Sequence, residues 1–161
     1  MNVDKDSLTN FTHEDWMQRA LKLAVRSFDI DEVPIGCVII HDNKIIGQGY
    51  NQCESLNDAT AHAEMIAITA ASSTLGSWRL NECSIYVTKE PCLMCAGAII
   101  NSRIDKLYFG CYDKDLGACG SKFEICGSLN FNSPSVVKGG VLENESLSII
   151  QEYFSTKRKE K

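Results

Sequence analysis

The feature that most constrains this chain is a pair of short motifs, His-Ala-Glu at residues 62–64 and Pro-Cys-Leu-Met-Cys at residues 91–95. Zinc in proteins takes tetrahedral sets of nitrogen and sulfur ligands, and a catalytic zinc keeps its fourth position for water. One imidazole and two thiolates leave that position open, so His62, Cys92 and Cys95 are candidate ligands. The chain must therefore fold so that the two motifs meet.

The cysteine pair taken alone is also compatible with a redox pair, with half of a structural zinc site, or with coincidence. A structural zinc needs a fourth protein ligand, usually from a second paired motif. His13 and His41 are isolated, and a redox pair would leave His62 and Glu64 without a role. The remaining cysteines form no second close pair along the sequence: Cys37, Cys53, Cys83, Cys111, Cys119 and Cys126.

Length and composition favour a single domain over residues 1–161, with one sizeable core, since 44% of the residues are hydrophobic. No stretch approaches the roughly 20 apolar residues that span a bilayer, so we expect no membrane association. The first residues lack the apolar segment of a signal peptide. With eight cysteines, a metal-type pair and no export signal, a reducing cytoplasm is the expected location.

The net charge of −5 gives no global sign of nucleic-acid binding, although phosphate contacts depend on local basic clusters. The one obvious cluster, at residues 157–159, is by itself typical of a solvated helix end.

Hydrophobic periodicity predicts an alternating order of helices and strands. Thr12, with Asp15 three residues on, indicates a helix start, and Pro91 suits a first helical position. The first two strands form a hairpin through residues 41–43. We expect a three-layer α/β/α sandwich around a five-stranded mixed sheet, with helices at 12–28, 61–74, 92–100 and 143–157, and strands at 35–40, 44–50, 84–88, 106–110 and 135–139.

This arrangement puts His62 and the cysteine pair in the first turns of two successive helices. Helix N-termini lower the pKa of thiols and so favour the thiolates that a metal requires. Cys92 and Cys95, three residues apart, share one helix face. Glu64, two residues beyond the histidine, can then reach a water on the metal and transfer protons.

The two motifs together match the established His-x-Glu…Pro-Cys-x-x-Cys signature of zinc nucleobase deaminases, which hydrolyse an amidine-type C–NH2 to C=O and release ammonia. Further motifs closely resemble the bacterial tRNA-specific adenosine deaminases over nearly the whole chain, from about residue 16 to 158. These motifs are Asp-Glu-Val-Pro-Ile-Gly at 31–36, Gly-Tyr-Asn at 49–51, Thr-Lys-Glu-Pro-Cys-Leu-Met-Cys-Ala-Gly-Ala at 88–98, Ser-Arg-Ile at 102–104, Phe-Gly-Cys-Tyr-Asp at 109–113 and Gly-Ala-Cys-Gly-Ser at 117–121.

The resemblance implies a cytidine deaminase-like fold and conversion of adenosine to inosine at the wobble position of a tRNA anticodon stem-loop. It also implies a homodimer with one zinc ion per subunit, His62, Cys92 and Cys95 as ligands, and Glu64 as the proton shuttle. The substrate contacts that it implies are Asn51 with the flipped nucleoside, Val33 and Pro34 as walls of the base pocket, Ala63, and Asp113 with the backbone or ribose of the loop.

Plainer roles stay open for these positions: Asn51 as the cap of a strand end, Val33-Pro34 as a connector, and Asp113 as an ordinary loop residue. The chain also departs from the family, many members of which carry a lysine two residues after the position of Asp113. Here Asp115 occupies that place, which puts in doubt the details of loop contact but not the reaction.

Two other functions compete at this point. A salvage deaminase for a free base or nucleoside, of guanine or cytosine type, shares the zinc motif but needs a lid over a small ligand. Tyr153-Phe154 with Lys157-Arg158 suits an open RNA groove instead. A zinc-stabilised scaffold has no use for Glu64 beside an open metal position.

Overall fold

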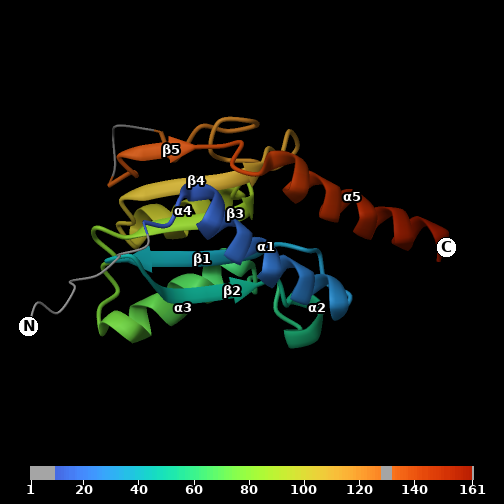
Figure 1. Ribbon diagram of the computed structural model, residues 1–161, viewed down its shortest axis with the longest axis horizontal. Coiled ribbons are helices and arrows are strands. Elements are labelled where there is room, and N and C mark those ends of the chain that lie inside the picture. The colour runs from blue at the N-terminus through green and yellow to red at the C-terminus, as the bar shows by residue number, and fades with distance from the viewer. Residues whose placement is uncertain (1–9, 128–131, 161) are drawn as a thin grey trace, which may run out of the picture.

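The structure, a computed structural model, describes residues 10–127 and 132–160. Its centre is a five-stranded sheet with strand order β2-β1-β3-β4-β5 (Figure 1). β1 pairs antiparallel with both β2 and β3, while β3, β4 and β5 run parallel. The strands are β1 (Gly36–His41), β2 (Lys44–Tyr50), β3 (Ser84–Lys89), β4 (Lys106–Cys111) and β5 (Val136–Lys138).

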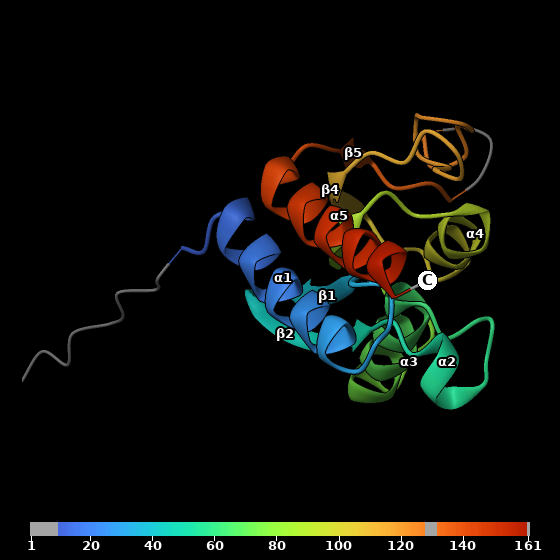
Figure 2. The same cartoon turned by 90° about the vertical axis from the view of Figure 1, so that its right-hand side faces the viewer.

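Helices cover both faces of this sheet (Figure 2). α1 (His13–Asp29) and α5 (Glu143–Lys159) lie on one face, and α3 (Ala63–Leu75) and α4 (Leu93–Asn101) lie on the other. The short helix α2 (Cys53–Leu56) leads into the segment before α3. The predicted three-layer sandwich around a mixed sheet is confirmed. No helix in the described ranges combines the length and the apolar character needed to cross a membrane.

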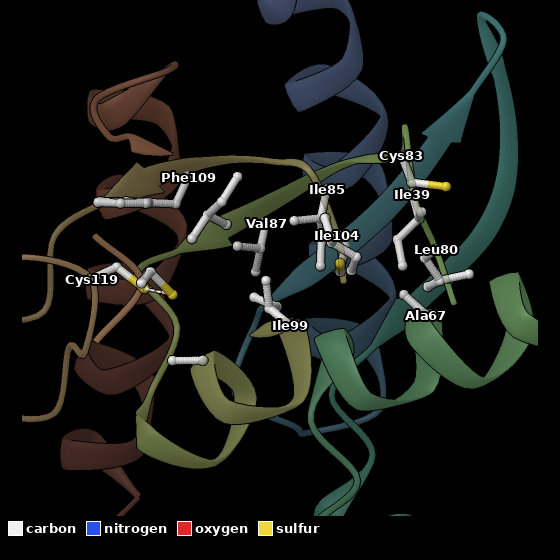
Figure 3. Packing of buried hydrophobic residues seen from close by; sticks show 14 of the residues in the cluster. Ile39, Ala67, Leu80, Cys83, Ile85, Val87, Ile99, Ile104, Phe109 and Cys119 are labelled. Atoms are coloured by element: carbon white, nitrogen blue, oxygen red, sulfur yellow. Dashed lines mark hydrogen bonds between the residues drawn. The ribbon is translucent and has the colours of Figure 1, made fainter. Parts of the chain in front are cut away.

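The central strands are buried on both faces, and their alternating side chains supply two separate cores. The larger core packs against α3 and α4, where Ile39, Ile85, Val87 and Phe109 meet Ala67 and Ile99 (Figure 3). The smaller core packs against α1 and contains Val38, Ile40, Tyr86 and Tyr108. Cys37 and Cys111 are buried within β1 and β4, and Cys83 is buried directly before β3, as expected of small hydrophobes.

Local sequence accounts for two of the element boundaries. Thr12 caps α1, and the reciprocal hydrogen bonds with Asp15 form a complete capping box. In the turn between β1 and β2, Asp42 and Asn43 have φ values of 47° and 57°. A two-residue hairpin turn with both φ values positive matches the twist of the strands, and Asn and Asp tolerate this conformation.

Two glycines of β2 let α3 approach the sheet closely. A Cβ atom on Gly49 would lie 2.4 Å from the carbonyl oxygen of Ala63, and one on Gly47 would lie 2.4 Å from that of Ala67. Side chains at either glycine would push the helix away. The first turn of α3, which carries the His-Ala-Glu motif, is therefore seated directly on the end of β2.

One prediction about the helices was wrong, and one short helix was not predicted. Pro91 is not the first helical residue, because Cys92 is the N-cap of α4 in an extended conformation, with φ −74° and ψ 176°. The carbonyl of Pro91 instead accepts a hydrogen bond from Ala118 N at 2.8 Å. Helix α2 was not predicted; with four residues it is too short to show a hydrophobic period.

Candidate active site

The starts of α3 and α4 bring the two motifs together. His62 is the N-cap of α3, Cys92 is the N-cap of α4, and Cys95 lies in the first turn of α4. Nδ1 of His62 is 3.7 Å from Sγ of Cys92 and 3.5 Å from Sγ of Cys95. The three donor atoms all lie within 4.8 Å of one another, as the motif spacing predicts.

This geometry fits a tetrahedral zinc ion. Zn–N bonds of about 2.0 Å and Zn–S bonds of about 2.3 Å place tetrahedral nitrogen and sulfur donors roughly 3.5 Å apart. Cys95 is buried, whereas His62 and Cys92 are half-buried. One side of the cluster therefore faces outward, where a fourth, non-protein ligand can bind. Within the described ranges, this is the one place where three or more such donors gather.

The two thiols differ sharply in acidity. The hydrogen bond with Cys95 lowers the pKa of Cys92 to about 3, although burial opposes this effect. The same hydrogen bond, followed by burial, raises the pKa of Cys95 far above its usual range. The hydrogen bond with Cys92 also raises the pKa of His62, again against burial. Because zinc binds thiolates, metal binding must release the proton that Cys95 holds.

Glu64 lies in the first turn of α3 beside this cluster. Its side chain is buried. Burial is the main reason why the pKa of Glu64 is raised, and the negative charge of Cys92 adds to the effect. A buried carboxylate with a raised pKa next to a metal cluster is suited to accept and return a proton.

Asn51 fixes the start of α3. Its side-chain Oδ1 accepts a hydrogen bond from the backbone N–H of Ala63 at 2.8 Å, and its backbone N–H donates to the carbonyl of Ile35 at 3.1 Å. Asn51, which directly follows the end of β2, therefore also holds the start of α3, and its NH2 group is a further donor. Ala63 is fully buried, and its backbone N–H is used by Asn51.

The segment at residues 33–35 is tied to this site through the Ile35 carbonyl. Pro34 is fully buried and Val33 is half-buried, so Val33 is the one that can touch a ligand. Val33 lines an open groove whose other wall is the C-terminal part of α5: Tyr153, Phe154, Lys157 and Arg158.

The carboxylate of Asp113 organises the loop after β4. Oδ2 forms an ion pair with Lys89 Nζ at 2.7 Å, and Oδ1 accepts hydrogen bonds from the backbone N–H groups of Asp115 and Leu116. Burial alone would raise the pKa of Asp113, but the bonds to Lys89 and Asp115 bring it below its ordinary value. Asp115 thus contributes a backbone donor that any residue except proline can supply at this position.

The two neighbouring aromatic residues of α5, Tyr153 and Phe154, differ in burial. Tyr153 is buried, and its hydroxyl donates to the carbonyl of Asp31 at 3.1 Å. Lys157 pairs with the carboxylate of Asp31. Phe154 is 43% exposed. Both residues line the groove beside Val33, but only Phe154 offers a largely exposed ring there.

A second pair of cysteines, missed in the sequence, lies between β4 and β5. Sγ of Cys119 is 2.9 Å from Sγ of Cys126, and both residues are buried. The pair is seven residues apart, a spacing typical of no metal or redox motif, so the sequence carried no signal for it. In the described part of the chain no third donor joins it.

Comparisons with known proteins agree with this geometry. Residues 11–111 match the cytidine and deoxycytidylate deaminase zinc-binding region. The tRNA-specific adenosine deaminase of Streptococcus pyogenes is 40% identical over 146 residues, covering 91% of this chain and 92% of that protein. The chloroplastic tRNA(adenine(34)) deaminase of Arabidopsis thaliana is 43% identical over 88% of this chain, which spans only 12% of that longer protein.

A solved structure from work on A-to-I editing by tRNA deaminases at the wobble position of transfer RNA also matches. It has a TM-score of 0.78 and 41% identity, and the match covers 83% of this chain and 97% of that chain. The cofactor of the matched region is zinc, which the cluster of His62, Cys92 and Cys95 suits. The chain belongs to the cytidine and deoxycytidylate deaminase family and, within it, to the tRNA-specific adenosine deaminases.

Proposed function

We propose that this protein hydrolyses adenosine to inosine at the wobble position of a tRNA anticodon loop and releases ammonia. The observation that carries the proposal is the meeting of one imidazole and two thiols at two helix starts, with the buried carboxylate of Glu64 beside them. The near full-length similarity to tRNA-specific adenosine deaminases selects the substrate.

In this proposal His62, Cys92 and Cys95 hold one zinc ion per subunit. When bound there, zinc lowers the pKa of a water ligand to roughly 7 and so makes hydroxide available at neutral pH. The donor set supports this because its spacing suits a tetrahedral ion, two of its three donors are cysteine sulfurs, and it is one ligand short of a closed structural site.

Glu64 moves the protons. Its carboxylate accepts a proton from the attacking water and delivers it to the ring nitrogen next to the reacting carbon. It then takes the proton of the newly added hydroxyl and passes it to the departing amino group, so that the C=O bond forms as the C–N bond breaks. The balance is adenosine plus water to inosine plus ammonia. Burial of Glu64 keeps its proton affinity high enough for the return transfer.

The proposed substrate contacts lie around this centre. The NH2 group of Asn51 donates to the flipped nucleoside while its carbonyl holds the start of α3. Val33 borders the groove toward α5, with Pro34 packed behind it. Ala63 lies between the metal ligand and the proton shuttle in the sequence, and Asp113, near the start of the loop after β4, contacts the backbone or ribose of the RNA loop.

The proposed partner is the anticodon stem-loop, whose unpaired bases can turn outward into a site. The exposed face of Phe154 and the basic groups of Arg158 and Lys159 supply local contacts on an otherwise acidic protein.

We further propose that the single domain acts in the cytoplasm, consistent with eight free cysteines.

A homodimer is part of the same proposal. A largely apolar groove runs along the outer face of α3, lined by residues such as Met65, Ile66, Thr69 and Ala70. A second copy of this chain is its proposed occupant, and sedimentation equilibrium of the zinc-loaded protein tests this.

The experiment that tests the function is incubation with an anticodon stem-loop that carries a wobble adenosine, in parallel with free adenosine, guanine and cytidine. Inosine in the stem-loop, with the three free compounds unchanged, is the expected result. Turnover of guanine or cytidine with an unchanged stem-loop would instead identify a salvage deaminase. Inactivity of the zinc-loaded protein on all four would favour a scaffold.

A further inference from the structure

The loop after β4, residues 112–123, is tied to a single buried carboxylate, that of Glu90. Glu90 follows the last residue of β3 and lies two positions before the metal ligand Cys92. Its side chain is 3% exposed. No part of the proposed proton transfer uses Glu90, so the reason for burying this acid lies in its contacts with the loop.

Four donors from the loop surround the Glu90 carboxylate. Oε1 accepts hydrogen bonds from the backbone N–H groups of Cys119 and Ser121, both at 3.0 Å. Oε2 accepts from the backbone N–H of Asp113 at 2.9 Å and from the hydroxyl of Ser121. A carboxylate offers about four lone-pair sites, so this set uses its full capacity. A buried charge is stable only while such partners stay in place.

The residues on either side of Glu90 bind the same loop. Lys89 pairs with the carboxylate of Asp113, and the carbonyl of Pro91 accepts from Ala118 N at 2.8 Å. Three consecutive residues thus hold the loop, and the next residue is the metal ligand Cys92. The position of the loop is therefore set relative to the metal cluster.

The outer surface of the loop is suited to contact a partner. It exposes three large apolar side chains, with Tyr112 48%, Leu116 61% and Phe123 41% accessible. Aromatic faces of this kind stack on unpaired bases, whatever the base. The loop thus combines an exposed contact surface with an inner face fixed to the site.

We propose that Glu90 is a positioning residue for the RNA substrate. It holds the loop at a fixed distance from the metal cluster, so that a nucleotide chain bound by the loop presents its adenosine to Glu64. This inference rests on the proposed function, because it assigns the loop to substrate binding. Glu90 itself touches neither the reacting atoms nor the metal.

The variant Glu90→Gln tests this with almost no change in size. The amide replaces one acceptor oxygen with an NH2 group, which faces N–H and O–H donors and cannot accept from them. Hydrogen bonds to charged groups are the stronger ones. We expect KM for the stem-loop to rise on the order of tenfold or more, with kcat within about threefold of wild type and zinc content unchanged.

The matched control is Glu124→Gln, at the exposed position directly after this loop, where the carboxylate accepts from the nearby Gly127 N–H. Its KM and kcat should equal those of the wild type. Ser121→Ala, which removes one donor and keeps the charge of Glu90, should raise KM in the same direction by a smaller factor. Ser121→Ala also keeps the test decisive if Glu90→Gln does not fold.

If the wild type is active on the stem-loop, two results would overturn this inference and leave the proposed function standing. One is an unchanged KM in both Glu90→Gln and Ser121→Ala. The other is a fall in kcat and zinc content at constant KM, which would give Glu90 a purely structural role. Inactivity of the wild type on the stem-loop would overturn the proposed function and, with it, this inference.

Discussion

The metal cluster and the surface proposed for RNA are built in different ways. The cluster takes its ligands from two helix N-termini, and its geometry follows from short motifs and backbone capping. The surface depends on ion pairs between distant segments: Lys89 with Asp113, and Lys157 with Asp31. Substitutions in the first region should abolish chemistry, whereas substitutions in the second should change affinity and leave chemistry intact.

The largest effect is expected from Cys92→Ala or Cys95→Ala. Loss of one thiolate leaves only two protein ligands, so both zinc and activity should disappear. Metal analysis beside a deamination assay measures this, with Cys53→Ala, a partly exposed cysteine outside the cluster, as the control. Full zinc occupancy in Cys92→Ala would show that the cluster has been misassigned.

Glu64→Ala should be nearly as damaging to turnover but harmless to the metal. General acid–base groups contribute on the order of 10²–10⁴-fold, and Glu64 serves several transfers, so the loss can be larger. Single-turnover deamination and zinc content should be measured on the same preparation. Near-normal single-turnover rates would remove Glu64 from the mechanism.

Substitutions in the surface proposed for RNA should have smaller effects. Arg158→Ala combined with Lys159→Ala should weaken stem-loop binding severalfold and flatten its salt dependence, since each lost phosphate contact lowers the slope by about 0.7 for a single strand. Lys157→Ala should change the slope less, because Asp31 already neutralises Lys157. Dissociation constants across a salt series measure this, and identical slopes for the double variant and the wild type would make the basic end of α5 a solvated helix end.

The smallest effect concerns the pH dependence of stability. Because the pKa of Asp113 is lowered by folding, the stabilisation it gives is present above pH 3.8 and is lost as the pH falls through the lower folded value. The Asp113→Asn variant should lack this pH-dependent stabilisation. Denaturant unfolding at a series of acidic pH values should therefore show a shallower fall in the free energy of unfolding for the variant, and parallel curves would contradict the role of the Lys89 ion pair.

Much of the fold and of the metal cluster could be predicted from the sequence, because both depend on local patterns. The capping box at Thr12 and the positive-φ turn at Asp42-Asn43 occur as their residue types indicate. The meeting of His62 with Cys92 followed from the chemistry of the ligands and from their place at helix starts.

The features that the sequence did not reveal depend on contacts between distant residues. The hydroxyl of the buried Tyr153 bonds to the Asp31 carbonyl, and nothing in the sequence of α5 indicates that partner. The contact of Cys119 with Cys126 and the four bonds of Glu90 arise from the path of one loop. The position of Pro91 outside α4 reflects the extended backbone of Cys92, which is the N-cap of that helix.

The most direct test of the proposed reaction uses the zinc-loaded protein and one anticodon stem-loop that carries adenosines both at the wobble position and elsewhere in the loop. Sequencing of the product locates each inosine. We expect inosine at the wobble position with the wild type and none with Glu64→Ala. Inosine distributed over all loop adenosines would contradict the assigned substrate position. Inosine formed equally by Glu64→Ala would contradict the role of Glu64.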